Sequence, residues 1–458
     1  MKRLPLLLVF LVGGIPCGAA DAAVTTSAAK PNILFIISDD QRGDCVGALG
    51  HPDLKTPALD TLVARGHVFH NAYCMGSMVG AVGQPSRTML MTGRSLWHIP
   101  GRTESETPTI GSVFRKAGFD TLFIGKQGNT YRPGNEAFET FVYNGEKNHI
   151  EAPIYMADKT IEWLRENPGS AGKPFCIYLG PPVPHDPRVA PPKYLEMYDP
   201  AKLTLPKSFM PQHPFDNGEL RIRDEMLASF PRTEANMRRQ LADYYAITSH
   251  LDFHVGRILD ELKAQGRLEE TLIVYTSDHG LAVGGMHGLM GKQNLYEHNK
   301  PPLIIAGPGI APGKSDALVY LYDLFPTLCD YAGLAVPERV DGLSLLPVIQ
   351  GEKKGVRDRL LGGYRDCQRM IRDARWKLIE YRAADGRHTQ LFDLENDPDE
   401  LSNLADETAH AETLAKLRQE LAAARAAYGD PTDFEAPFTR TDEAKGASTK
   451  KKKAKASP

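Results

Sequence analysis

The sequence has little net charge and no extended apolar run of the length that spans a membrane. Its 458 residues include 54 basic and 57 acidic side chains, which gives a formal net charge of −3. This balance provides no overall field that favours nucleic acid or an anionic membrane, so an anionic ligand must be bound by a local arrangement of side chains. The length is sufficient for one large domain with a smaller appendage.

Cysteine is also scarce. The six cysteines are scattered and lack the spacing of a metal or redox site: Cys17, Cys45, Cys74, Cys176, Cys329 and Cys367. If Cys17 is removed with an N-terminal leader, an odd number remains, which argues against a disulfide framework. We therefore expect small buried apolar side chains with at most one disulfide pair.

The N-terminus has the pattern of a secretory signal. A basic start precedes an apolar run from Leu4 to Val12, and small residues follow up to Ala22. This pattern predicts a signal peptide over residues 1–22 and a secreted or periplasmic mature protein. The run is much shorter than the roughly 20 residues of a membrane span, so we expect no transmembrane segment. A lipid anchor at Cys17 is an alternative, which Pro16 disfavours.

Alternating strand and helix signals predict an α/β fold over residues 31–350. Helices are expected from Thr56 to Gly66, from Thr107 to Gly118 and from about Thr233 to Ala264, on the basis of threonine caps, proline in the first turn and glycine at the end. This alternation indicates a mostly parallel sheet sandwiched by helices. Five short apolar runs predict strands buried on both faces: Ile33–Ile37, Leu122–Ile124, Phe175–Leu179, Leu272–Tyr275 and Leu303–Ala306.

A different pattern begins at residue 351. Short strands are expected at 369–372, 376–381 and 390–393, followed by a helix at about 408–428. Residues 351–436 are therefore predicted to form a small antiparallel subdomain with one helix. The remaining Lys-rich stretch, 437–458, is predicted to be a disordered tail.

Acidic residues follow two of the predicted strands. The first strand leads into Asp39 and Asp40, and the strand at 272–275 leads into Asp278 and His279. Sites in open parallel sheets form at the carboxyl ends of the strands, and three carboxylates gathered there need a divalent cation to offset their repulsion and desolvation. The alternatives are that the aspartates are ordinary loop caps and that His279 is a hydrogen-bonding neighbour. Both Asp39 and Asp40 reach one ion only if the backbone turns between them.

A third motif connects these observations to a known family. The run from Gly83 to Arg87, Gly-Gln-Pro-Ser-Arg, followed by Thr-Gly-Arg at 92–94, resembles the signature of the sulfatases of the alkaline-phosphatase superfamily. In that signature, Cys or Ser stands first and is oxidised to formylglycine, the nucleophile. Nearly the whole mature chain shares the likeness, including Ser38–Asp40, Gly125-Lys126, Pro184–Arg188, Ser277–Gly280, Gly291-Lys292, 375–379 and 391–398.

The resemblance implies an alkaline-phosphatase-like fold and the hydrolysis of sulfate esters, with a sulfated small molecule or glycan as partner. It implies a calcium ion with four ligands: Asp39, Asp40, Asp278 and His279. It also implies four further site residues, namely Arg87 as anchor of the nucleophile loop, Lys126 and Lys292 as contacts to sulfate oxygens, and His185 as the group that protonates or orients the leaving alkoxide.

Two positions depart from the family pattern. Gly83 stands where the nucleophile is expected, and Gln127 and Gly128 follow Lys126 where the family has an aromatic residue and a histidine. Ser86 is expected to cap the helix that follows, and Cys74 lacks the Pro-Ser-Arg context of the signature.

The sequence therefore supports two main hypotheses. The chain is either a hydrolase of sulfated glycans or aryl sulfates, or a catalytically impaired relative that binds sulfated ligands. A phosphate or phosphonate ester hydrolase is a third, weaker alternative, because such enzymes usually carry more metal ligands or a Thr or Ser nucleophile. The loops expected to contact the leaving group, 129–134 and 211–225, contain no recognisable motif.

Overall fold

A computed structural model describes residues 30–145, 147–167 and 173–438. The signal peptide predicted over 1–22, with Cys17, lies outside the described residues, as does almost all of the predicted tail at 437–458. Export and the disorder of the tail therefore stay predictions. Among the described residues, no helix is both long and apolar enough to cross a membrane. The five cysteines of the described ranges are all free.

The centre of the molecule is an eight-stranded sheet with the order β5-β4-β6-β1-β7-β8-β2-β9. The predicted α/β fold is confirmed, and each of the five predicted strands is present. Strands β4, β6, β1 and β7 run parallel, whereas β8 runs antiparallel to both of its neighbours. The bounds are β1 Asn32–Ser38, β2 His67–Tyr73, β4 Asp120–Gly125, β5 Thr140–Tyr143, β6 Phe175–Gly180, β7 Thr271–Ser277, β8 Leu303–Ala306 and β9 Gly313–Tyr320.

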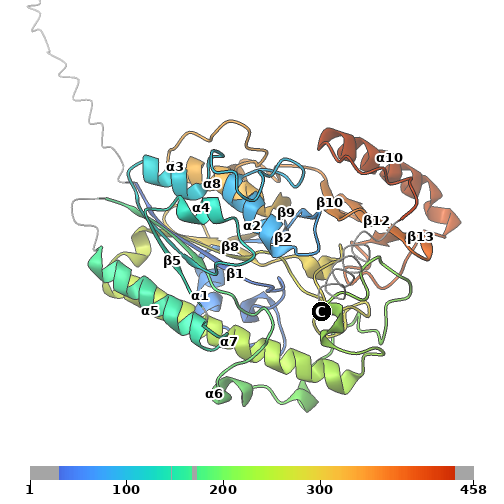
Figure 1. Cartoon of the computed structure of the whole chain (residues 1–458), viewed down its shortest axis with the longest axis horizontal. Coiled ribbons are helices and arrows are strands. Elements are labelled where there is room, and N and C mark those ends of the chain that lie inside the picture. Colours follow the sequence, from blue (N-terminus) through green and yellow to red (C-terminus); the bar gives the residue numbers. More distant parts are fainter. Residues whose placement is uncertain (1–29, 146, 168–172, 439–458) are drawn as a thin grey trace, which may run out of the picture.

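The central strand β1 contributes to two hydrophobic cores. Leu34 and Ile36 face one core, which includes side chains from α1, α5 and α7, whereas alternate residues face another core, formed with α2, α3 and α8 (Figure 1). Successive strand residues point to opposite faces of a sheet, so an apolar run fills both layers. The helix bounds are α1 Pro57–Arg65, α2 Gly83–Thr92, α3 Ile110–Lys116, α5 Glu151–Glu166, α7 Glu234–Ala264 and α8 Leu324–Tyr331.

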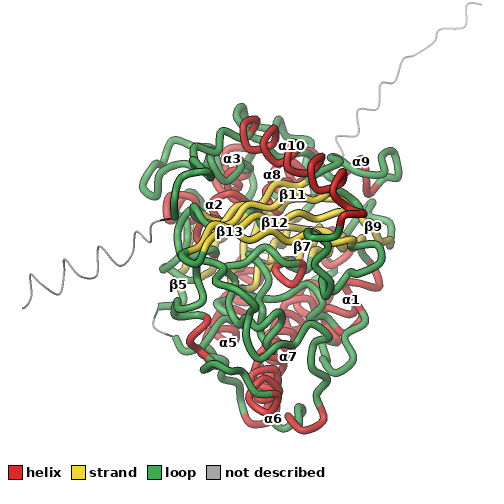
Figure 2. The backbone as a smooth tube through the Cα atoms, turned by 90° about the vertical axis from the view of Figure 1, so that its right-hand side faces the viewer, coloured by secondary structure: helices red, strands yellow, loops and turns green. Residues whose placement is uncertain are grey.

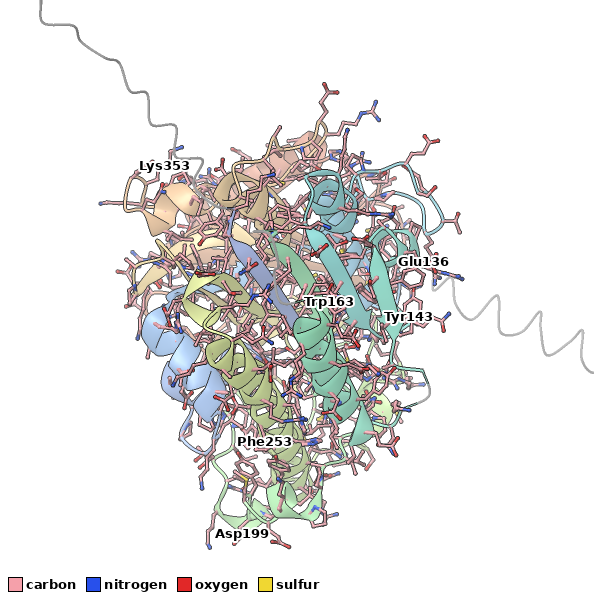
Figure 3. All side chains as sticks on the ribbon, turned by 90° about the vertical axis from the view of Figure 1, so that its left-hand side faces the viewer. Glu136, Tyr143, Trp163, Asp199, Phe253 and Lys353 are labelled. Atoms are coloured by element: carbon pink, nitrogen blue, oxygen red, sulfur yellow. The ribbon has the colours of Figure 1, made fainter. Side chains whose placement is uncertain are left out.

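Figure 3 shows the side of the molecule covered by α5 and the long helix α7. Trp163 of α5 packs edge-on against Phe175 at the start of β6, with ring centroids 6.3 Å apart and an interplanar angle of 90°. Such aromatic contacts add to the free energy gained by burying apolar surface. They hold α5 against the sheet. Short helices complete this domain: α4 Arg132–Glu136, α6 Pro192–Leu195 and α9 Leu346–Ile349.

The predicted start of α1 at Thr56 and Pro57 is confirmed, but two predicted threonine caps need correction. Helix α3 begins at Ile110, and Thr109 rather than Thr107 caps it, in a reciprocal capping box with Ser112. The Thr56 hydroxyl caps no helix; it accepts from the Gly47 amide at 2.8 Å and donates to Asp60. Proline in the first turn and a terminal glycine signal a helix well, but several nearby hydroxyl residues compete for the cap. The long helix α7 matches the prediction, and Thr233 caps it.

A second sheet, with the order β13-β12-β11-β10-β3, lies beside the first (Figure 2). Helix α10, Ala411–Ala427, packs along it through Leu417 and Leu421. The three predicted antiparallel strands are present with longer bounds: β11 Gln368–Arg372, β12 Trp376–Ala383 and β13 Gly386–Asp393. Strand β10, Leu360–Tyr364, was not predicted. The predicted domain boundary at 350/351 remains a prediction.

The fifth strand of the second sheet comes from the first half of the chain. Strand β3, Gly76–Ser77, pairs in parallel with Gly363 and Tyr364 of β10. Gly76 has a φ of +117°, and a Cβ there would lie 1.9 Å from the Gly363 carbonyl oxygen. Only glycine permits this approach. The segment that leads into α2 is thereby tied to the C-terminal sheet.

Candidate functional site

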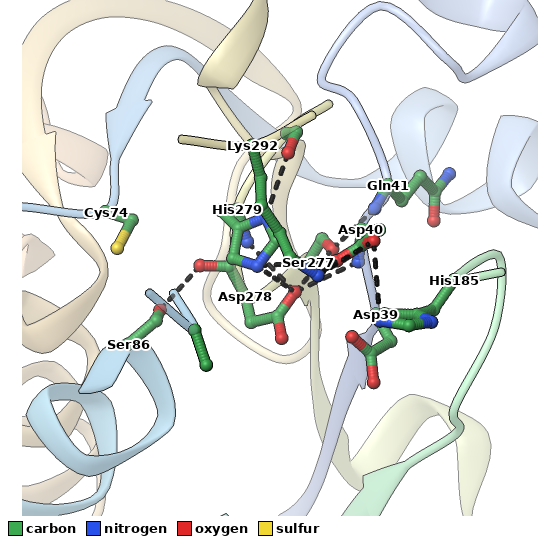
Figure 4. A network of polar contacts seen from close by, with 12 residues as sticks. Asp39, Asp40, Gln41, Cys74, Ser86, His185, Ser277, Asp278, His279 and Lys292 are labelled. Carbon is green, nitrogen blue, oxygen red and sulfur yellow. Dashed lines mark hydrogen bonds and ion pairs between the residues drawn. The ribbon is translucent and has the colours of Figure 1, made fainter. Parts of the chain in front are cut away.

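The carboxyl ends of β1 and β7 lie side by side, with Ser38 opposite Ser277 in a parallel register. The residues that follow therefore leave the sheet at the same edge, as the sequence predicted. All four predicted metal ligands are at most 1 % exposed: Asp39, Asp40, Asp278 and His279. Figure 4 shows these side chains converging, with His185 and Lys292 beside them.

The backbone turns at Asp40. Its φ is +68°, in the left-handed region that few residues other than glycine adopt, and its amide donates to Asp278 Oδ1 at 3.0 Å. Asn and Asp are among the residues that tolerate this conformation. The turn ends the strand alternation, so Asp39 and Asp40 both reach the site. This is the local change that the predicted metal site requires.

The donor set fits a divalent cation. Ligand atoms of Asp40, Asp278 and His279 all lie within 4.8 Å of one another, and a second such group consists of Asp39, Asp40 and His185. His279 Nδ1 bonds to the Gly280 carbonyl at 2.9 Å, while its buried Nε2 has no hydrogen-bond partner and lies 3.4 Å from Asp40 Oδ1. An imidazole held through one nitrogen, with the other facing carboxylates, is the arrangement of a metal ligand.

The three predicted cationic residues and His185 also meet at these carboxylates. Lys126 forms an ion pair with Asp39, and Lys292 Nζ lies 3.0 Å from Asp40 Oδ1. Arg87, from α2, donates to Asp278 Oδ2 at 3.2 Å and to the Ser38 carbonyl at 3.1 Å. His185 Nε2 lies 3.9 Å from Asp40 Oδ2. The structure thus brings these predicted site residues together from six separate segments of the chain.

Charge neutralisation governs ionisation in this cluster. Burial raises the pKa of Asp39 and Asp40, but neighbouring cations outweigh it, chiefly Lys126 for Asp39 and Lys292 for Asp40, so both pKa values lie well below the ordinary range. Burial lowers the pKa of Lys292, but Asp40 and Asp224 raise it above its usual value. Both aspartates are therefore ionised and Lys292 is protonated at neutral pH.

Gly83 is the first residue of α2 and is buried against the same cluster. A Cβ on Gly83 would lie 2.7 Å from Asp278 Oδ2 and 3.7 Å from His279 Nε2. The position at which the resemblance predicts the nucleophile therefore faces the predicted metal ligands, and it carries no side chain. Gly128 differs, because a Cβ there would have no atom within 4 Å.

The expected role of Ser86 as a helix cap is wrong. Helix α2 begins at Gly83 after Val82, which places Ser86 inside the first turn. The Ser86 hydroxyl donates to the Asp278 backbone carbonyl at 2.5 Å, so it joins α2 to the end of β7. Nearby, burial raises the pKa of the Cys74 thiol to about 11, which keeps it protonated and weakly nucleophilic at neutral pH.

Other polar residues of the site were missed by sequence reasoning. Asp224 Oδ2 lies 3.8 Å from Lys292 Nζ and accepts from Gln293 Nε2 at 2.8 Å. The Gln41 side-chain oxygen accepts from the Ser38 hydroxyl, and the Gln41 backbone amide donates to Ser277 Oγ. These two bonds stabilise the turn at the end of the strand. Asp224 lies in the loop at 211–225, which has no motif. Only the folded structure brings Asp224 to the site, so the sequence offers no signal for it. Gln41 directly follows the predicted acidic pair, and this position could have pointed to it.

Comparison with known families decides what this cluster belongs to. A model of the family described as Sulfatase matches residues 31–334, which is more than half of the chain. The chain belongs to the sulfatase family. A second family model, described as N-sulphoglucosamine sulphohydrolase, C-terminal, matches residues 285–427 of the same chain. The resemblance noted in the sequence is thereby confirmed.

Individual relatives of this sulfatase-family chain span most of its length. A choline-sulfatase of Rhizobium meliloti (strain 1021) is 30 % identical over 89 % of the chain and 88 % of its own length. An arylsulfatase of Clostridium perfringens (strain 13 / Type A) is 28 % identical, covering 85 % and 93 %. A structure solved in complex with its substrate D-glucosamine-2-N,6-O-disulfate superposes with a TM-score of 0.74 at 23 % identity, covering 89 % and 99 %. That likeness shows the alkaline-phosphatase-like sulfatase fold.

Proposed function

We propose that this chain binds sulfate esters at a calcium ion. The observation that carries the proposal is the convergence of four buried candidate ligands, three cationic side chains and one imidazole at one edge of the sheet. Asp39, Asp40, Asp278 and His279 would hold the ion, because hard oxygen donors suit calcium and the free Nε2 supplies a further donor.

Calcium supplies positive charge that offsets the carboxylates and attracts the sulfate oxygens. The protein's own cations complete the anion site. Lys126 and Lys292 are partly to fully buried ammonium groups that contact Asp39 and Asp40, and they are placed to donate to sulfate oxygens. Arg87 holds Asp278 and the end of β1 in place. His185 lies at the more exposed side of the cluster, where it can donate to the bridging oxygen of the ester.

Gly83 makes binding without efficient turnover the first candidate. Family hydrolysis depends on a formylglycine at this position, and glycine has no side chain to oxidise. Loss of a covalent nucleophile costs on the order of 10⁴ to 10⁶ in turnover, or roughly 5 to 8 kcal/mol of transition-state stabilisation. Gly128 leaves a second position of the family pattern without a functional group.

Hydrolysis of sulfate esters is the second candidate function. It is favoured by the complete set of cations, which would stabilise charge on the leaving oxygen, and by relatives that are named sulfatases. The proposed ligands are sulfated glycans or aryl sulfates, since relatives include an arylsulfatase and a structure with a sulfated sugar. The signal-like N-terminus supports action outside the cytoplasm.

Calorimetry and a sulfate-release assay on the same purified protein separate the candidates. Calcium should bind first, and 4-nitrophenyl sulfate should then bind only to the calcium-loaded protein. Release of sulfate no faster than with calcium and buffer alone supports the binding function. Release clearly above that background favours the hydrolase. A protein that binds neither calcium nor the ester would overturn both.

A further inference from the structure

We propose that Arg223 determines ligand specificity at the mouth of the site, and that it selects a hydroxyl-rich leaving group such as a sugar. This inference rests on the proposed sulfate-ester function and names the part of the ligand beyond the sulfate. It comes from a closed ring of charged and imidazole side chains that the loop at 211–225 completes.

The inner part of the ring is the proposed sulfate site. From Asp40, one branch passes to Lys292, 3.0 Å away, and then to Asp224, 3.8 Å from Lys292 Nζ. The other branch passes from Asp40 to His185 at 3.9 Å and then to Asp186, whose Oδ1 lies 3.5 Å from His185 Nδ1. The two branches leave the same carboxylate and reach two carboxylates nearer the surface.

Arg223 closes the ring. Its guanidinium donates to both oxygens of Asp186, at 2.8 and 2.9 Å, and to Asp224 Oδ1, at 2.7 and 3.0 Å. Arg223 is the most exposed member of the ring: 61 % of its side chain is exposed, against 2 % for Asp40, 9 % for Asp224, 12 % for Asp186 and 18 % for His185. Arg223 therefore lies at the outer end of the ring, opposite Asp40. A ligand whose sulfate contacts the inner cations directs the rest of the molecule towards Arg223.

The loop is fixed independently of any ligand. Glu225, the second residue after Arg223, is 2 % exposed and accepts from the backbone amides of Met290 and Gly291 at 2.9 and 2.8 Å. Arg232 donates to the same carboxylate at 2.5 Å. A Cβ on Gly291 would lie 2.8 Å from Glu225 Oε1, so glycine before Lys292 permits this close packing. The Arg223 guanidinium is thus pre-oriented, which lowers the entropic cost of binding.

The chemistry of the rim favours hydroxyl groups. Asp186 and Asp224 offset the charge of Arg223, so a second anionic group on the ligand gains little attraction there. Sugar hydroxyls can accept from the guanidinium and donate to the carboxylates, whereas an aryl ring offers no such groups. The ring members present charged or imidazole groups rather than an apolar surface to a leaving group.

The test compares three probes on the calcium-loaded full chain: glucose 6-sulfate, 4-nitrophenyl sulfate and inorganic sulfate. Calorimetry should show that Arg223→Ala raises the Kd of glucose 6-sulfate roughly 3- to 10-fold, the loss of one or two hydrogen bonds, and changes the Kd of inorganic sulfate less than about twofold. Arg221→Ala is the matched control, since Arg221 lies exposed in the same loop without a hydrogen bond or ion pair to another described residue. It should leave all three values unchanged.

Three results would overturn the inference. If Arg223→Ala weakens the binding of all three probes equally, the role of Arg223 is purely structural. If glucose 6-sulfate binding is unchanged, Arg223 does not contact the ligand. A wild-type preference for 4-nitrophenyl sulfate over glucose 6-sulfate would contradict the chemistry of the rim. If inorganic sulfate still binds in these cases, the proposed sulfate function stands; if no probe binds the wild type, both fail.

Discussion

The two sides of the site differ in what they retain. The ends of β1 and β7 carry Asp39, Asp40, Asp278 and His279, which are all buried and belong to two candidate ligand groups that share Asp40. The start of α2 and the segment after β4 carry Gly83 and Gly128, at the two positions where the resemblance to the family predicts reactive side chains. Binding groups and reactive groups thus come from different elements. One set can be lost while the other keeps its geometry.

The retained side is held together by the protein alone. Lys126, Lys292 and Arg87 pair with the three aspartates, and a buried ion pair that loses one partner leaves an uncompensated charge. The retained residues therefore contribute to folding as well as to ligand binding. The two glycines take part in no such pairs. Substitutions of the buried charged residues should therefore lower stability and calcium binding strongly. Substitutions of the two glycines should have effects that depend on the space around each glycine.

The largest expected effect comes from restoring the missing chemistry. Gly83→Cys combined with Gly128→His, co-expressed with a formylglycine-generating enzyme, should raise sulfate release from 4-nitrophenyl sulfate on the order of 10⁴-fold. Asp278 must shift slightly, because the new Cβ starts 2.7 Å from its Oδ2. Nitrophenol absorbance measures the rate.

The control for this restoration is Gly83→Ala with Gly128→His, which adds bulk without an oxidisable group and should stay at background. If the restored variant binds calcium, carries formylglycine by mass spectrometry and still releases no sulfate, the residue at position 83 does not by itself limit turnover.

The second expected effect concerns the retained side. Asp40→Asn removes one proposed ligand and leaves Lys292 without its nearest charge partner, so the free energy of unfolding should fall by about 3 kcal/mol and calcium should no longer raise the melting temperature. Urea titration measures the free energy of unfolding, and thermal unfolding with calcium or with a chelator measures the melting temperature. Asp316→Asn, at an exposed carboxylate that pairs with His70, should change neither. A full calcium response in Asp40→Asn would exclude Asp40 as a ligand.

The third expected effect is a loss of stability at acidic pH, which limits the pH range in which variants of the two sides can be compared. His213 is buried, bonds to the Phe215 carbonyl and to Tyr296, and burial lowers its pKa to about 4. Its unfolded pKa is about 6.5, so the unfolded chain binds a proton that the folded chain excludes. This contribution to stability is complete above pH 6.5 and is lost as the pH falls towards 4, by up to about 3 kcal/mol.

Urea unfolding at pH 7 and pH 5 measures this dependence. His213→Gln should lose less stability between the two pH values than the wild type does. His410→Gln, at a histidine beside Glu407, should keep the wild-type slope. An unchanged slope in His213→Gln would show that other groups govern the acid sensitivity.

The smallest expected effect contrasts the two glycines directly. Gly83→Ala places a methyl group against Asp278 and should weaken calcium binding several-fold, the effect of roughly 1 kcal/mol of overpacking. Gly128→Ala meets open space and should leave calcium binding unchanged, with stability within about 0.5 kcal/mol of the wild type. Calcium titration followed by thermal unfolding compares the two. Equal losses would show that Gly83 does not face the metal ligands.

Sequence reasoning succeeded where local pattern and sheet geometry coincide. The apolar runs before Asp39 and Asp278 predict adjacent buried strands, and the acidic residues after them meet because parallel strands end at one edge. The motif residues Arg87, Lys126, His185 and Lys292 were placed by resemblance alone, since nothing in their own neighbourhood points to the cluster.

The remaining features depend on contacts between distant segments. Asp224 reaches Lys292 only after two loops fold together, and Ser86 bonds to a backbone carbonyl that no motif predicts. Thr109 rather than Thr107 caps α3, because the hydroxyls of Thr109 and Ser112 each accept a hydrogen bond from the other residue's backbone amide. Such contacts involve ordinary polar residues, whose partners are set by tertiary structure rather than by spacing along the chain.

The pairing of β3 with β10 has a consequence for the timing of synthesis. Gly76 and Ser77 precede α2 by only a few residues, yet their partners Gly363 and Tyr364 are translated about 290 residues later. At ordinary elongation rates this interval is roughly 15 to 60 s. Throughout it, the segment that leads to Gly83 lacks its final neighbour. A chain that stops before β10 should therefore present this stretch to any enzyme or chaperone that acts on nascent polypeptides.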